Sequence, residues 1–301
     1  MSIIKNHHAL KGIFWAVVSC FFSGIMVNMV KHVSHDLHTV QIIFIRNLFA
    51  FMMFLPIVAF KGKDFFKTQR LGLHILRSST GMLSMMIYFY GISIMNISVV
   101  TAISFTAPIF TAILAIFFFN DKPNIHQIFG FFMGLVGCLI VIHPGAEGYD
   151  PNSLIVLCSA VFWAFSGIII KKLSQTEAPL KTTFYMTLIM TFMSAPLAFY
   201  HWNAPSAEDY MWVLGIAFTS NFLQYGIAKS LSHADLSVLL PFDFLRMFFS
   251  AGFAYIIFGE RLDYYAAVGS IVIMCSAVYS VFNERRKYRR QLARTTLGKT
   301  F

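Results

Sequence analysis

Apolar stretches of about 20 residues recur along the whole chain, each long enough to cross a hydrocarbon layer of about 30 Å as a helix. Hydrophobic residues make up 57% of the 301 residues and charged residues only 12%, so a soluble domain would lack the polar surface to cover its core. Barrel strands would alternate polar and apolar residues, whereas stretches such as 109–119 are apolar on every face. The sequence therefore predicts an all-α integral membrane protein with ten transmembrane helices. The predicted spans lie near residues 12–31, 39–60, 72–93, 98–119, 126–143, 152–171, 182–201, 208–228, 236–258 and 264–283.

Positive residues gather in alternate joints between these spans, and such joints usually lie in the cytoplasm. Most of the 23 Lys and Arg residues fall on the side that holds the amino end, and Arg77, near the start of the third span, is counted among them. Only Lys31 and Arg261 fall in joints on the other side. We therefore expect both termini in the cytoplasm. Residues 286–301 form a basic tail that we expect to contact anionic membrane lipids rather than nucleic acid.

The chain reads as two diverged copies of one unit, residues 1–145 and 150–285, with a shift of 139 or 140 positions between them. Lys31, after the first span, corresponds in this way to Lys171 after the sixth. Each copy holds five predicted spans, an odd number, so the second copy enters the membrane from the opposite side. Inverted repeats of this kind are typical of transporters that alternate between two conformations around a site near the membrane midplane.

Sequence motifs for other chemistries are absent. The chain has no phosphate-binding glycine loop, no metal-ligand pattern and no serine or cysteine nucleophile motif, so we expect no cofactor, no metal and no enzymatic activity. The spacing of His32, His35, Asp36 and His38 in the first outside joint fits a solvated segment better than a metal site. A polytopic membrane enzyme would need paired catalytic residues at helix depth, and a scaffold would need large docking loops. Both remain remote alternatives.

Several segments carry a family resemblance. Arg46, the segment from Pro108 to Asp121 and the joint from Phe258 to Arg261 resemble the drug/metabolite transporter superfamily, EamA-type. Within it, the segments His74 to Arg77 and Pro241 to Arg246 are similar to the S-adenosylmethionine uptake carriers of intracellular bacteria. The resemblance implies a secondary transporter of the bacterial inner membrane that moves a small polar metabolite, with S-adenosylmethionine first. Riboflavin, amino acids and drugs are the alternatives within the same superfamily.

Arg46, Asp243 and Arg246 are taken as ionisable residues well inside predicted spans, where a charge costs about 2.5 to 3.5 kcal/mol and marks a candidate site. Asp243 and Arg246 are three residues apart on one helix face and can pair. Asp243 could bind an amine or sulfonium, or carry a coupling proton, while Arg246 or Arg46 could bind a carboxylate. The alternatives are a structural ion pair for the first two residues and an Arg46 side chain that reaches the lipid interface. Met186 stands where the second copy would repeat Arg46, so we expect a chemically lopsided site.

Polar and aromatic residues at mid-helix depth form a second group of candidates, because an adenine or flavin ring needs aromatic faces for stacking and amides for its edge. Trp163 and Gln224 are the preferred members, and interhelical packing is the alternative for each. Pro108 and Pro241 are expected to mark broken or kinked helices around the site. The whole group of substrate-binding candidates is Asp243, Arg246, Arg46, Trp163, Gln224, Tyr88, Asn221 and Trp15.

A small-residue face runs along the fifth span, formed by Gly130, Gly134 and Gly137. Such a face permits close helix packing, either within one chain or between two copies. The family resemblance favours the fifth and tenth helices as the surface of a homodimer.

Overall fold

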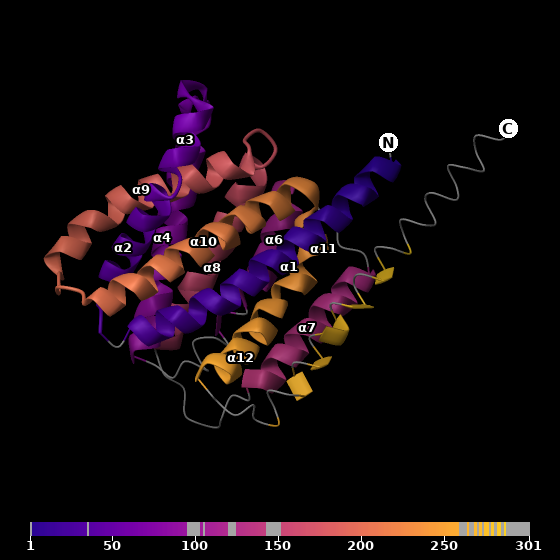
Figure 1. Ribbon diagram of the computed structural model, residues 1–301. Helices are drawn as coiled ribbons and strands as arrows, with labels where there is room; N and C mark the ends of the chain where they lie inside the picture. The colour runs from indigo at the N-terminus through magenta and orange to yellow at the C-terminus, as the bar shows by residue number, and fades with distance from the viewer. Residues whose placement is uncertain are drawn as a thin grey trace.

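The computed structural model describes residues 2–34, 36–94, 103–104, 106–119, 125–142 and 152–258, and separate residues between 264 and 286. In this part of the chain every regular element is a helix, which confirms the predicted all-α class (Figure 1). The joints 120–124 and 259–263, and part of the tenth predicted span, lie outside the described residues. The helices are α1 (Ser2–Val33), α2 (Thr39–Met52), α3 (Leu55–Lys61), α4 (Leu71–Ile94), α6 (Ala107–Phe119), α7 (Ile125–Ile142), α8 (Asn152–Leu173), α9 (Pro179–Tyr200), α10 (Ala207–His233), α11 (Leu236–Asp243) and α12 (Leu245–Phe258), with a 3₁₀ helix η1 (Lys63–Phe66) before α4.

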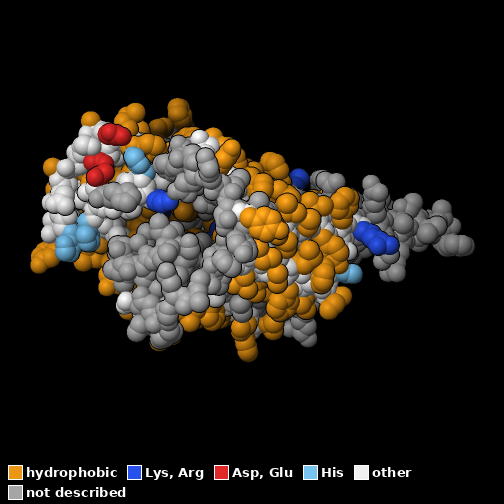
Figure 2. All heavy atoms as spheres, turned by 90° about the horizontal axis from the view of Figure 1, so that it is seen from below, with side chains coloured by type: hydrophobic (Ala, Val, Ile, Leu, Met, Phe, Trp, Pro, Cys, Tyr) orange, Lys and Arg blue, Asp and Glu red, His pale blue; other side chains and the backbone are white. Residues whose placement is uncertain are grey.

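Four of the described helices are long and apolar enough to cross a membrane by length and composition. They are Ala9–Val33, Thr39–Phe60, Leu154–Leu173 and Pro179–Tyr200. The surface agrees with a lipid environment, since Figure 2 shows a broad field of hydrophobic side chains over one part of the molecule. Large apolar side chains on α6, α7 and α12 are more than half exposed, among them Phe117, Phe132 and Ile256. A soluble monomer would not leave so much apolar surface in water.

The helices pack mainly across the two copies that the sequence predicts. α1 lies between α10 and α12, as Figure 1 shows, while α8 packs along α4 and α6. α2 lies against α9. One hydrophobic cluster joins α1, α8, α10 and α11, and a second joins α1, α2, α9 and α10. α1 and α10 therefore contribute to both cores.

The ninth predicted span, 236–258, is interrupted rather than continuous. α11 ends at Asp243 and α12 begins at Leu245, with Phe244 between them. Pro241 lies inside α11, where its ring removes a backbone N–H and crowds the carbonyl four residues earlier. Phe244 is fully buried against α7, so closely that a Cβ added to Gly134 would lie 2.4 Å from the Phe244 ring. The interruption is therefore held in place by packing on Gly134.

The second predicted span, 39–60, also divides. α2 ends at Met52, and α3 begins at Leu55 with Pro56 in its first turn. Proline is accommodated in a first helical turn because the N–H that it lacks has no partner there. The two pieces still run as one apolar span.

Candidate functional site

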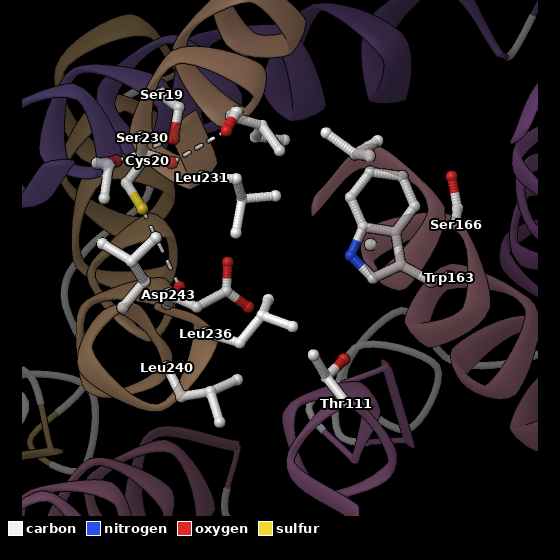
Figure 3. Close-up of a pocket in the computed structure, with 15 residues that line it drawn as sticks. Ser19, Cys20, Thr111, Trp163, Ser166, Ser230, Leu231, Leu236, Leu240 and Asp243 are labelled. Carbon is white, nitrogen blue, oxygen red and sulfur yellow. Dashed lines mark hydrogen bonds between the residues drawn. The ribbon is translucent and has the colours of Figure 1, made fainter. Parts of the chain in front are cut away.

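A cavity of about 100 Å³ lies between α1, α6, α8, α10 and α11. Figure 3 shows the Asp243 carboxylate and the Trp163 indole on opposite walls of this cavity. Hydroxyl groups of Ser19, Thr111 and Ser166 add polar points to a wall that is otherwise apolar. The cavity thus offers one anionic group, one large aromatic face and a few hydrogen-bonding groups.

Asp243 reaches the cavity because α11 ends there. Cys20 of α1 contacts the Phe242 carbonyl at 3.4 Å and ties this helix end to α1. An Asp243 oxygen lies 3.7 Å from Nη2 of Arg246, on the other side of the interruption. This separation exceeds ordinary hydrogen-bond length, and the side chains of Asp243 and Arg246 are 36% and 21% exposed. The carboxylate is therefore paired with Arg246 and still accessible to a ligand.

Trp163 lies on a face of α8 that is turned to the cavity. Ser166, Gly167 and Ile170 follow it at helical spacing and line the same wall. The indole is only partly buried, so its face can receive a flat or cationic group.

A second polar centre lies away from the cavity wall and involves Arg77, which the charge pattern assigned to a cytoplasmic joint. That assignment is wrong. Arg77 lies in α4, and its side chain is 2% exposed. The joint ends at Arg70 and α4 begins at Leu71, so Arg77 is more than one helical turn inside the span. The signal was available, because a charge inside a predicted span is a site candidate by the rule applied to Arg46.

The two buried arginines are incompletely bonded. Arg77 Nη2 donates to Oε1 of Gln224 at 2.7 Å, while its Nε and Nη1 have no hydrogen-bond partner among the described residues. Arg46 is also 2% exposed, so its side chain does not reach the lipid interface. Its Nη1 contacts Met85 Sδ at 3.1 Å, and Nη2 lies at 3.5 Å from Asn47 Oδ1. In the described part of the chain neither guanidinium forms an ion pair with an acidic side chain.

The arginine centre, formed by Arg77, Arg46 and Gln224, adjoins the cavity. Gln224 lies three residues before Ile227 and seven before Leu231, so these α10 residues share one helix face, and the latter two line the cavity. On the other side, a Cβ added to Gly81 of α4 would lie 3.5 Å from Ser166 Oγ on the cavity wall. Arg77 lies one turn before Gly81. On α10 and on α4 alike, the residues of the arginine centre lie about one helical turn from the cavity.

The other predicted candidates lie outside the cavity wall. Trp15 packs edge-on against Tyr225, with ring centroids 5.3 Å apart. Asn221 donates to the Ala50 carbonyl at 3.0 Å, and its own side-chain oxygen is buried without a described partner. Tyr88 packs against the core of α1, α2, α9 and α10. Pro108 lies in the first turn of α6, which begins at Ala107.

The small-residue face of α7 packs within the chain. Gly134 receives Phe244, and the Gly130 carbonyl accepts a hydrogen bond from Ser276 Oγ at 2.6 Å. Of the two alternatives for this face, contact within one chain therefore accounts for Gly130 and Gly134.

His38, before α2, and His201, after α9, form a stacked pair of histidine rings. The rings of His38 and His201 lie 4.5 Å apart, and burial together with the charge of His201 lowers the pKa of His38 below its usual value. His35 lies outside the described residues, and within those residues no group of three His, Cys, Asp or Glu is placed to hold a metal.

Comparisons with known proteins identify the family and the fold. The EamA-like transporter family matches residues 10–143 and again residues 152–282. The chain is 28% identical over 277 residues to the S-adenosylmethionine uptake transporter of Rickettsia prowazekii, covering 92% of this chain and 94% of the relative. It is 24% identical over 292 residues to the riboflavin transporter of Vibrio cholerae, covering 95% and 98%. A solved crystal structure shares the fold with a TM-score of 0.78 at 12% identity, over 91% of this chain and 98% of its own.

Proposed function

This chain belongs to the EamA-like transporter family, as its sequence predicted, and we propose that it is a secondary transporter that takes up S-adenosylmethionine. It is a multi-pass protein of the bacterial inner membrane. The observation that carries the proposal is the cavity with Asp243 and Trp163 on facing walls. The ligand has a sulfonium cation for the carboxylate and an adenine ring for the indole. The relatives named S-adenosylmethionine uptake transporters support this substrate.

The architecture that we propose has ten membrane spans in two inverted halves, residues 1–145 and 150–285, with both termini and the tail 286–301 in the cytoplasm. Two observations support it. The family matches the chain twice, once in each half. Helices of one half also pack on helices of the other half. α1 packs on α10, and α8, which corresponds to α1 at a shift of 140 residues, packs on α4. Such symmetry provides two related conformations for alternating access.

In the proposed binding mode Asp243 holds the sulfonium and Trp163 stacks on the adenine. Arg246 orients Asp243 across the interruption after Pro241, and Arg46 meets the carboxylate. Trp15, Tyr88 and Asn221 pack around the site without lining the cavity, and Pro108 begins the helix that supplies Thr111.

Riboflavin is the second candidate, favoured by the Vibrio cholerae relative and by the aromatic cavity wall. Riboflavin has no cationic group to offer Asp243, which is why it ranks second. We also propose a homodimer through α7 and the tenth span. The exposed α7 side chains Phe129, Phe132 and Val136 would then contact a second copy instead of lipid.

The test is uptake of radiolabelled S-adenosylmethionine by cells that lack a carrier for it, with wild type compared with Asp243→Asn and with Asp36→Asn. Asp36 is an exposed residue of the outer joint and provides the same chemical change away from the cavity. We expect saturable uptake by wild type and Asp36→Asn, and a loss of about 10- to 100-fold in Asp243→Asn at equal membrane levels. No uptake by wild type above cells without the protein would refute this substrate.

A further inference from the structure

Arg77 and Arg46 place two positive charges in the buried interior of the helical domain. Both side chains are 2% exposed, and Nη1 of Arg46 contacts Sδ of Met85 in α4, the helix that carries Arg77. A buried charge is strongly unfavourable unless it is paired, and two like charges add their repulsion. In the described residues the hydrogen-bond acceptors of these groups are two amides and a thioether, none of which carries a charge.

From this imbalance we propose that Arg77 and Arg46 together bind the carboxylate of the transported metabolite. This inference rests on the proposed transport function and narrows its substrates to solutes that carry a carboxylate beside a cation. S-adenosylmethionine meets that condition, because a short carbon chain joins its sulfonium to an amino acid carboxylate. Riboflavin does not.

Arg77 has donors available for this role. A guanidinium carries five N–H donors in a planar fork that matches a carboxylate. Gln224 accepts a hydrogen bond from Nη2, and Nε and Nη1 are buried without a described partner. Arg46 adds an unpartnered Nε. Buried donors of this kind are costly to leave unbonded, so a carboxylate that reached them would gain strong, charge-assisted hydrogen bonds.

Arg77 and Gln224 each lie one helical turn from a residue at the cavity wall. Arg77 lies one turn from Gly81, which faces Ser166 of the cavity wall, and Gln224 lies one turn from Ile227 of the same wall. A metabolite with its cation at Asp243 would therefore have its other end directed toward α4. The anionic and cationic ends of the ligand would meet oppositely charged ends of one site.

Gln224 is a positioning residue in this arrangement, because it acts through Arg77. It comes from α10, 147 residues away from Arg77 along the chain, and its bond of 2.7 Å fixes one edge of the guanidinium. The neutral amide orients the guanidinium without neutralising it. A glutamate at this position would accept the same hydrogen bond but would supply the missing negative charge from within the protein.

The first experiment uses the ligand. Uptake of labelled S-adenosylmethionine by wild type is challenged with unlabelled S-adenosylmethionine or with its decarboxylated analogue, which keeps the sulfonium, amine and adenine. We expect the decarboxylated analogue to compete at least about tenfold more weakly. In Arg77→Gln the two competitors should become equal, while Arg70→Gln, which changes the exposed arginine just before α4, should behave as wild type. Equal competition by the two compounds in wild type overturns the proposal. The same result is expected if an inorganic anion, and not the ligand carboxylate, occupies the arginines.

The second experiment uses Gln224→Glu in purified protein and in cells. We expect the melting temperature without ligand to rise above that of wild type, because Arg77 gains an internal counter-ion, while uptake falls at least about tenfold. A merely structural Gln224–Arg77 contact predicts unchanged uptake, since the hydrogen bond is kept, and that result overturns the proposal. If wild type transports no S-adenosylmethionine, the proposed function fails by itself. The ligand-free melting temperatures of Gln224→Glu and Gln224→Met then decide the inference, and a Gln224→Glu variant no more stable than wild type overturns it.

Discussion

The two polar centres of this protein balance their charges differently. Asp243 stands at a helix interruption, partly exposed, with Arg246 at 3.7 Å as its partner. Arg46 and Arg77 are almost fully buried and have no acidic partner among the described residues. The charge of Asp243 is therefore balanced by a neighbouring side chain, whereas the charges of Arg46 and Arg77 are not. In the carrier without ligand the charges of Arg46 and Arg77 are the unbalanced ones, so the carboxylate of a doubly charged ligand would gain most there.

The centres also differ in origin. Both arginines come from the first half of the chain, on α2 and α4, while Asp243 and Trp163 come from the second. Met186, the counterpart of Arg46, is a buried apolar residue that packs with Met82 and Met190. In the architecture that we propose, duplication accounts for the scaffold, and divergence between the halves accounts for a site with two unlike ends.

The largest effect is expected when the ligand loses one of its two charges. S-adenosylhomocysteine lacks the sulfonium charge but keeps the carboxylate, so it should lose the attraction of Asp243 alone. We expect wild type to prefer S-adenosylmethionine by about 10- to 100-fold in competition, and Asp243→Asn to lose this preference. Retention of the preference in Asp243→Asn would place the cation elsewhere.

Substitution of Gly134 tests whether packing on α7 holds the helix interruption at Phe244 in place. A Cβ at Gly134 would lie 2.4 Å from the Phe244 ring, so Gly134→Ala should destabilise the protein by about 1 to 3 kcal/mol and lower its melting temperature. Gly167→Ala is the matched control, because nothing lies within 4 Å of its added Cβ. Equal melting temperatures for the two variants would mean that Phe244 is not fixed by α7.

Arg46→Met gives the first half the residue that the second half has at this position. Removal of a buried charge without an acidic partner should raise the melting temperature, while the lost carboxylate contact should lower uptake by about tenfold. Thermal unfolding and uptake are measured on the same preparation. A variant that is less stable and fully active would assign Arg46 to packing.

The smallest effect is expected from Arg246→Ala. The pair with Asp243 is long and partly exposed, and pairs of this kind contribute about 0 to 1 kcal/mol. Uptake should fall by a few-fold at most, in contrast to Asp243→Asn. A loss as large as that of Asp243→Asn would show that Arg246 contacts the ligand directly.

The sequence predicted the helical class, the family and a group of charged candidates, because hydrophobic runs and isolated charges are local signals. It missed Arg77, since a positive residue near the end of a span was assigned to the joint by charge counting. The position of Arg77 inside the span was a usable signal, but its contact with Gln224, which comes from a distant helix, was not. Pro241 drew attention to the ninth span, but the place of the interruption at Phe244 depends on its packing against Gly134, which no local pattern encodes.

The central claim is that this protein carries S-adenosylmethionine by exposing one site alternately to the two sides of the membrane. Counterflow in liposomes tests it most directly, with unlabelled S-adenosylmethionine inside and a trace of labelled compound outside. The account predicts a transient accumulation of label above equilibrium, which Gln224→Glu and Asp243→Asn fail to produce. A simple rise to equilibrium without overshoot, or no entry at all, would contradict it.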